Sequence, residues 1–175
     1  VDPYNVSFDV SKELLQLPEQ VLFLHANCVT PDLLSQWHGR SVCMGPKFPW
    51  EDETDLNCSR MSGPTVTNTA LKAAIEMGFS NILLSGVDLC NSKTGVSHAS
   101  GSNEGRVGPI FGKHGVYVET YAGNKAETSI AFDTAILALS GQAKLVKDKG
   151  VCVYNLSKNA ARAEHIEHVP TSGLS

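Results

Sequence analysis

The chain has 175 residues, 42% of them hydrophobic, and a formal net charge of −4. This length predicts one folded domain with a sizeable core, and the mild charge argues against a nucleic-acid partner. No apolar run is long enough for a membrane span. The five cysteines form no CxxC pair, which predicts a reduced, cytoplasmic protein without a disulfide framework or a cysteine-based metal site.

The first part of the chain alternates short apolar runs with a helical segment. Residues 21–24 (VLFL) are typical of a strand that is covered on both faces. Thr30 and Pro31 suit the cap and the first turn of a short helix. A second brief strand is expected at 41–44. Residues 45–60, with prolines and several acids, predict a long loop.

The most informative stretch begins at a helix start and ends at an acid. Pro64 suits the first turn of a helix over 64–77, because its missing N–H would have no partner there. Apolar side chains follow at helical spacing. A buried strand is expected at 81–87, and Asp88 follows it directly.

This stretch predicts an anion site and a nearby carboxylate. Small and polar residues, Ser62, Gly63 and Thr65, leave the first N–H groups of the helix accessible, which favours a phosphate or a carboxylate. Asp88 lies where open α/β sheets bind their ligands. The alternative is that Ser62 and Thr65 only cap the helix, and that Asp88 only caps the turn after its strand.

Residues 89–115 are polar and rich in glycine, which predicts a mobile lid over a site. This segment contains His98, whose imidazole suits proton transfer near neutral pH. A solvated histidine in an insertion without a role is the alternative.

The rest of the chain continues the alternation. We expect a strand at 115–120, a long helix at 124–147 that Gly141 weakens, a last strand at 151–154 and a short helical segment at 159–165. Strands that alternate with helices predict a parallel sheet with helices on both faces. The expected fold is therefore a single Rossmann-like α/β domain over residues 1–175, with three layers (α/β/α).

Polar residues follow several of the expected strands: Asp88, Thr120, and Asn155 with Ser157. In a parallel sheet the carboxyl ends of the strands lie at one edge, where ligands bind. The sequence therefore predicts a polar ligand site at that edge.

The string SGPTVTNTAL at 62–71 and the string LLSGVDL at 83–89 resemble the bacterial motility accessory factor family, flagellin glycosyltransferases of the domain-of-unknown-function 115 group. They are also similar to the helix start and strand end of bacterial family 42 sialyltransferases. The Ser-His-Ala sequence at 97–99 and the closing string VYNLS at 153–157 fit the same resemblance. The archaeal 6-hydroxymethylpterin pyrophosphokinases share the superfamily core.

The resemblance implies a transferase that binds a nucleotide-activated sugar, above all a nonulosonic acid linked to cytidine monophosphate (CMP). A hydroxyl of a protein or a glycan would accept the sugar. Ser62, Gly63 and Thr65, with Asn68 beside them, would hold the carboxylate or phosphate of the donor.

The resemblance also places Asp88 near the donor or the acceptor, and Asn155 and Ser157 at the nucleotide end. In the transfer that we expect, either Asp88 or His98 would be the catalytic base. Glycosyl transfer of this kind requires no metal, whereas the alternative, a pyrophosphokinase that uses ATP, requires Mg²⁺. These families carry a nucleotide-binding strand upstream, so the chain is expected to be a fragment of a longer protein. A non-catalytic binding module is the third alternative.

Overall fold

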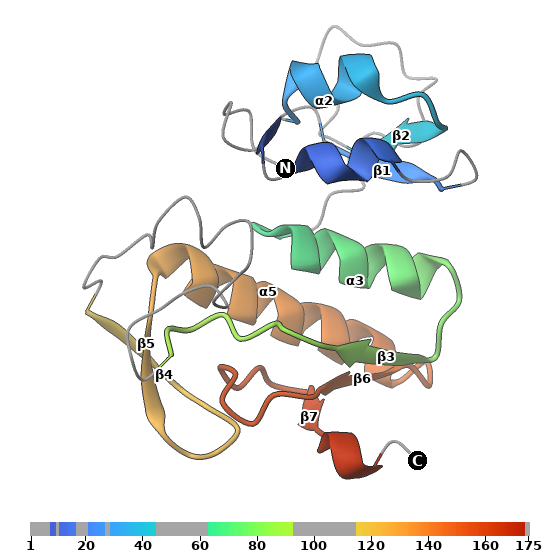
Figure 1. Cartoon of the computed structure of the whole chain (residues 1–175). Helices are drawn as coiled ribbons and strands as arrows, with labels where there is room; N and C mark the ends of the chain where they lie inside the picture. Colours follow the sequence, from blue (N-terminus) through green and yellow to red (C-terminus); the bar gives the residue numbers. More distant parts are fainter. Residues whose placement is uncertain are drawn as a thin grey trace, which may run out of the picture. The chain divides into compact units, whose positions relative to one another are not determined.

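The computed structural model describes residues 8, 9, 11–16, 21–26, 29–44, 63–92 and 115–173. Contacts divide the chain into an N-terminal unit (residues 1–61) and a C-terminal unit (residues 62–175), and each is described by itself. The elements form a mixed α/β fold with small, mostly parallel sheets (Figure 1). The expected single domain and three-layer arrangement stay predictions. Within the described part of the chain, no helix has the length and apolar character that crossing a bilayer demands.

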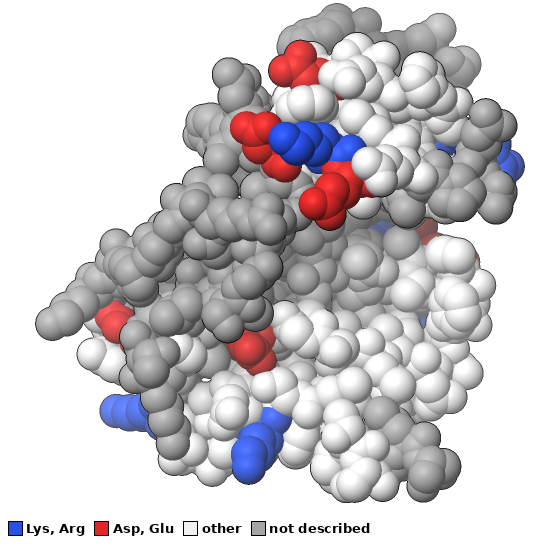
Figure 2. All heavy atoms as spheres, in the orientation of Figure 1, with Lys and Arg blue, Asp and Glu red and all other residues white. Residues whose placement is uncertain are grey.

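The N-terminal unit contains the two short strands and the helix that its sequence predicts. Strand β1 (Phe23–His25) pairs in parallel with β2 (Ser41–Cys43), and α2 (Pro31–Gln36) connects them. The short helix η1 (Lys12–Gln16) precedes β1. Leu33 of α2 is completely buried. Figure 2 shows acidic and basic side chains next to one another on this unit.

The C-terminal unit is built on a three-stranded parallel sheet. Its strands are β3 (Asn81–Leu84), β6 (Cys152–Asn155) and β7 (Glu167–His168), in that order across the sheet. Two helices pack against it: α3 (Val66–Glu76) and α5 (Ile130–Lys147). Figure 1 shows these helices side by side over the sheet.

The long helix begins later than residue 124, where the sequence predicts its start. Strand β4 (Val116–Glu119) pairs in antiparallel fashion with β5 (Lys125–Thr128), which occupies residues that the sequence assigns to the helix. Gly123, with φ of 76°, lies in the turn between the two strands. Helix α5 begins only at Ile130, where the Ser129 hydroxyl accepts a hydrogen bond from the Phe132 N–H at 3.2 Å.

Helix α5 continues through the exposed Gly141 without a break, and the weakening expected at this glycine stays a prediction. One further expectation is wrong. The expected helix at 159–165 is instead a series of turns with one isolated bridge between Thr120 and Ala161. A 3₁₀ turn, η2 (Thr171–Gly173), closes the described chain.

The core of the C-terminal unit lies between the two helices and the sheet. Leu71 of α3 and Leu139 of α5 are almost completely buried there, against Leu84 of β3 and Val153 of β6. Because one face of the sheet is fixed by this packing, the residues beyond the strand ends hold defined positions at one edge.

Candidate functional site

A cavity of about 650 Å³ lies in the C-terminal unit, beyond the carboxyl ends of β3 and β6. Its wall comes from the segment after β3, the β4–β5 hairpin and the segment after β6. The lining residues are Asp88, Cys90, Asn91 and Ser92; Thr120, Asn124, Lys125, Ala126 and Glu127; and Ser157, Lys158 and Asn159. The volume falls in the range of about 300–1,000 Å³ that is typical of small-molecule sites.

The strand register brings the polar ends together. Leu84 lies opposite Asn155 in the parallel pair, so the chain leaves both strands at the same edge. Asp88 and Ser157 therefore meet at one cavity, as the sequence predicts. Thr120 reaches the same cavity from the hairpin, where the Ala122 N–H donates to the Lys158 carbonyl at 2.8 Å.

The backbone around Asp88 is held from β6 and from the segment that follows it. The Asn155 Nδ2 donates to the Val87 carbonyl at 3.0 Å, and the Ala161 N–H donates to the Asp88 carbonyl at 2.8 Å. The Asp88 side chain itself is exposed. The carboxylate thus projects from a fixed backbone and is accessible to a ligand.

The next residues are held from β5. Leu89 has φ of 51°, a left-handed conformation that is uncommon for a residue other than glycine. Its carbonyl accepts a hydrogen bond of 2.6 Å from the Thr128 hydroxyl, and the Asn91 N–H donates to the Glu127 carbonyl at 2.8 Å. Strand β5 therefore fixes the cavity wall directly after Asp88.

Asn155 and Ser157 differ in their access to the cavity. The Asn155 side chain is buried, and its Oδ1 accepts a hydrogen bond from the Ser157 N–H at 2.9 Å while its Nδ2 binds Val87. Both amide atoms are thus used within the fold, whereas Ser157 lines the cavity. Asn155 thus holds the segment in which Ser157 and Lys158 form part of the cavity wall.

Cys90 gives the cavity a buried thiol. Its Sγ donates to the Asn159 carbonyl at 3.4 Å, and burial raises the pKa of the Cys90 thiol above its usual value. The thiol is therefore protonated near neutral pH and is a poor nucleophile there.

The start of α3 is a tight side-chain cap. Gly63 has φ of 76°, and a Cβ there would lie 2.6 Å from the Asn68 side chain. The Thr65 hydroxyl donates to Asn68 Oδ1 at 2.7 Å, and Asn68 is completely buried. Asn68 Nδ2 donates to the Ala135 carbonyl of α5 at 3.1 Å. The side chains of Thr65 and Asn68 serve the fold, so anion binding here would fall to backbone N–H groups.

The structure therefore separates the predicted residues into groups. Asp88 and Ser157 line one cavity, and Asn155 lies behind its wall. Gly63, Thr65 and Asn68 lie at the start of α3 and do not line that cavity. Ser62 and His98 lie outside the described residues, so their predicted roles stay predictions.

Comparison with known families places the chain. The model of the family described as 6-hydroxymethylpterin diphosphokinase MptE-like matches residues 1–94, slightly more than half of the chain. The protein belongs to the MptE-like family. No curated protein and no solved structure matches it. The matched MptE-like region includes α3, β3 and Asp88, and it ends before the hairpin that completes the cavity.

Several cavity residues of this MptE-like protein escaped the sequence interpretation. Lys125, Asn91 and Asn159 carried no motif, and Lys125 reaches the cavity only because β5 forms a hairpin. Lys158 follows Ser157 directly, and its position after the last strand could have indicated that it lines the site.

The arrangement combines an exposed carboxylate with exposed cations. Asp88 can accept a proton or bind a sugar hydroxyl, and the ammonium groups of Lys125 and Lys158 can pair with phosphate. Figure 2 shows both signs of charge on the drawn face of this unit. Among the described residues, no three His, Cys, Asp or Glu side chains cluster as a metal site would require.

Proposed function

We propose that this MptE-like protein is a glycosyltransferase that moves a nonulosonic acid from a CMP donor to a hydroxyl of a protein or a glycan, on a Rossmann-like scaffold. The segments at 62–71 and 83–89 support this proposal through their similarity to motility accessory factors and family 42 sialyltransferases. The observation that carries it is the cavity in which Asp88 and Ser157 meet beyond two parallel strands.

The cavity offers partners for each part of such a donor. Lys125 and Lys158 would pair with the phosphate and with the sugar carboxylate. Ser157 and Asn159 would bind the nucleoside hydroxyls, because their side chains can donate and accept hydrogen bonds. Gly63 and Thr65 precede Val66, the first residue of α3, and do not line this cavity, so the anion site that the sequence predicts there would be a separate one.

The transfer follows from these groups. The acceptor hydroxyl oxygen forms a bond to the anomeric carbon, while the bond from that carbon to the CMP phosphate oxygen breaks. CMP leaves with the electron pair, and the lysine ammonium groups stabilise its charge. The acceptor proton passes to the Asp88 carboxylate, with His98 as the alternative base.

One observation favours a second function. The matched family is named for a 6-hydroxymethylpterin diphosphokinase. In that reaction a hydroxymethyl oxygen attacks the β-phosphorus of ATP, and AMP leaves. Such a transfer needs Mg²⁺, which carboxylates and phosphate oxygens hold, so Asp88 would then contact the metal.

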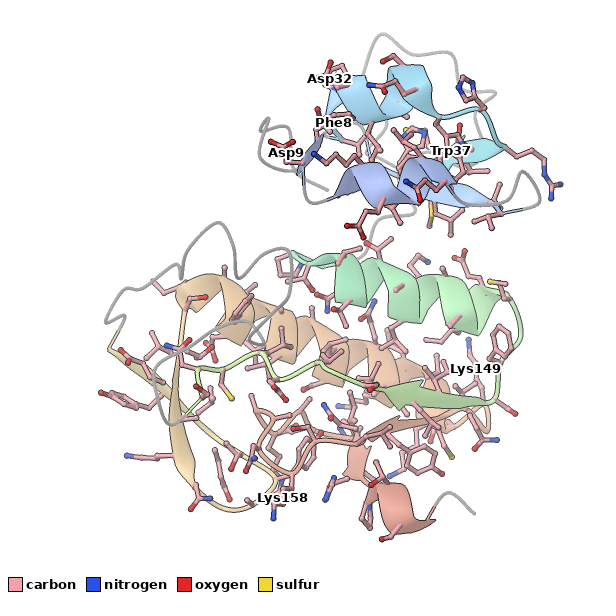
Figure 3. All side chains as sticks on the ribbon, in the orientation of Figure 1. Phe8, Asp9, Asp32, Trp37, Lys149 and Lys158 are labelled. Carbon is pink, nitrogen blue, oxygen red and sulfur yellow. The ribbon has the colours of Figure 1, made fainter. Side chains whose placement is uncertain are left out.

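The test compares matched substitutions in and outside the cavity. Figure 3 labels Lys158 next to the hairpin and Lys149 beyond the end of α5. We expect the wild-type protein to release CMP from CMP-N-acetylneuraminic acid. Asp88→Asn should lower kcat for this release by about 100-fold or more, because the substitution removes a general base. Lys158→Met should weaken CMP binding, measured by calorimetry, whereas Lys149→Met should not.

Two results would contradict the proposal. Binding of ATP–Mg²⁺ with formation of AMP, and no response to CMP, would favour the diphosphokinase. No binding of either nucleotide would favour a non-catalytic module.

A further inference from the structure

We infer that Thr128 is a positioning residue, whose hydroxyl holds the turn that carries Asp88 so that the carboxylate faces the cavity. The inference rests on the proposed function only in giving Asp88 a role in transfer. That the hydroxyl holds the turn can be tested without any substrate.

The first support is the backbone of Leu89, directly after Asp88. A φ of 51° is unfavourable for leucine, whose Cβ crowds the backbone in this region. Such conformations persist where the surrounding structure determines them, and they are concentrated at functional sites. Leu89 therefore needs an external partner to hold its conformation.

Thr128 is that partner. Its hydroxyl donates to the Leu89 carbonyl at 2.6 Å, the shortest side-chain hydrogen bond described in this region. Thr128 is completely buried, so water cannot replace the hydroxyl without a rearrangement. The neighbouring residue of β5 adds the bond from the Asn91 N–H to the Glu127 carbonyl, so β5 holds the turn at two points.

The clamp continues on the other side of Asp88. The carbonyls of Val87, Asp88 and Leu89 accept hydrogen bonds from Asn155, Ala161 and Thr128 respectively. Three successive carbonyls are thus bound by three separate segments, while the Asp88 side chain stays exposed. Figure 1 shows the segment after β3 running toward the β4–β5 hairpin that supplies Thr128. A rigid backbone beneath a free carboxylate is what a preorganised reactive group requires.

The chemistry of threonine gives a sharp test. Thr128→Val keeps the branched shape and removes the donor, which leaves the Leu89 carbonyl without its partner. Thr128→Ser keeps the donor and removes only a methyl group. A role that depends on the hydroxyl predicts that serine restores function, whereas a role in packing predicts that valine is tolerated.

We expect Thr128→Val to lower kcat for CMP release about tenfold or more, since small misplacements of a reacting group can cost about 100-fold. KM for the CMP donor should change less than kcat, and Thr128→Ser should restore most of the loss. In Thr128→Val the amide hydrogens of Asn91 and Ala161 should exchange faster, whereas that of Val153 in β6 should not.

Unchanged kcat in Thr128→Val, or a Thr128→Ser variant as impaired as Thr128→Val, would overturn the inference. If Thr128→Val does not fold, Thr128→Ala takes its place. If neither hydroxyl-free variant folds, the hydroxyl is a stability element and the inference fails. If the wild-type protein releases no CMP, the proposed function fails, and unchanged amide exchange in Thr128→Val would separately reject the clamp.

Discussion

Replacing Asn68 by alanine should destabilise the C-terminal unit strongly, because this buried amide joins two helices. Its Oδ1 accepts hydrogen bonds from the Thr65 hydroxyl at 2.7 Å and from the Thr65 N–H at 3.3 Å. Its Nδ2 donates to the Ala135 carbonyl at 3.1 Å and to Gln142 Oε1 at 3.4 Å. The substitution removes every one of these contacts from a side chain with no solvent exposure.

The expected magnitude follows from the groups that lose partners. A buried donor or acceptor left unsatisfied costs about 1–3 kcal/mol. Thr65 is only half-buried, so water can bind its hydroxyl and N–H in part, and Ala135 keeps its position within α5. We therefore expect a loss of about 2–4 kcal/mol in the free energy of unfolding, from the unsatisfied groups together with a small cavity.

Urea denaturation followed by far-ultraviolet circular dichroism measures this loss, because α3 and α5 dominate the helical signal of the C-terminal unit. Tryptophan fluorescence would report the other unit, since Trp37 and Trp50 both precede residue 62. The control is Asn81→Ala, the same substitution at an exposed position, which should change stability by less than about 0.5 kcal/mol. A loss as small as the control's in Asn68→Ala would refute the reasoning.

Three further predictions concern stability. Leu139→Ala should lower the free energy of unfolding by about 2–5 kcal/mol in the same assay, because the side chain is 1% exposed in the core; a loss below about 1 kcal/mol would contradict this packing. Gly63→Ala should lower the thermal midpoint more than Gly150→Ala, since both glycines have positive φ but only at Gly63 would a Cβ contact Asn68; equal midpoints would argue against the close contact. Burial raises the pKa of the Cys90 thiol in the folded protein, so the unfolded chain loses this proton at lower pH than the folded protein does. The free energy of unfolding should therefore fall as the pH rises through the usual thiol pKa and above it. Urea midpoints measured from neutral to alkaline pH should show this fall, and a Cys90→Ala variant with the same slope would contradict it.

The sequence predicts elements well where local signals agree. The apolar runs that become β3 and β6 are short, and polar residues or turns bound them, so their place and their polar ends could be predicted. The strand at Lys125–Thr128 could not, because its state depends on pairing with β4. The usable signal there was Ser129, a capping residue directly before the apolar helical pattern.

In the candidate site, too, local signals predict some residues, whereas others depend on contacts between distant segments. Asp88 and Ser157 could be predicted, because each follows a strand of one parallel pair. The bond from Thr128 to Leu89 joins residues 39 positions apart, and it exists only once the hairpin has formed beside the end of β3. No local sequence pattern indicates such a contact. The complete burial of Asn68 between two helices is likewise not indicated by any local pattern.

The most direct test of a nucleotide site at the Asp88 cavity is the titration of the isotope-labelled protein with CMP, followed by nuclear magnetic resonance of the backbone amides. We expect saturable shifts at Asn91, Lys158 and Asn159, with weaker binding in Lys158→Met and unchanged binding in Lys149→Met. Saturable shifts confined to residues away from this cavity, or no shifts at millimolar CMP, would contradict it.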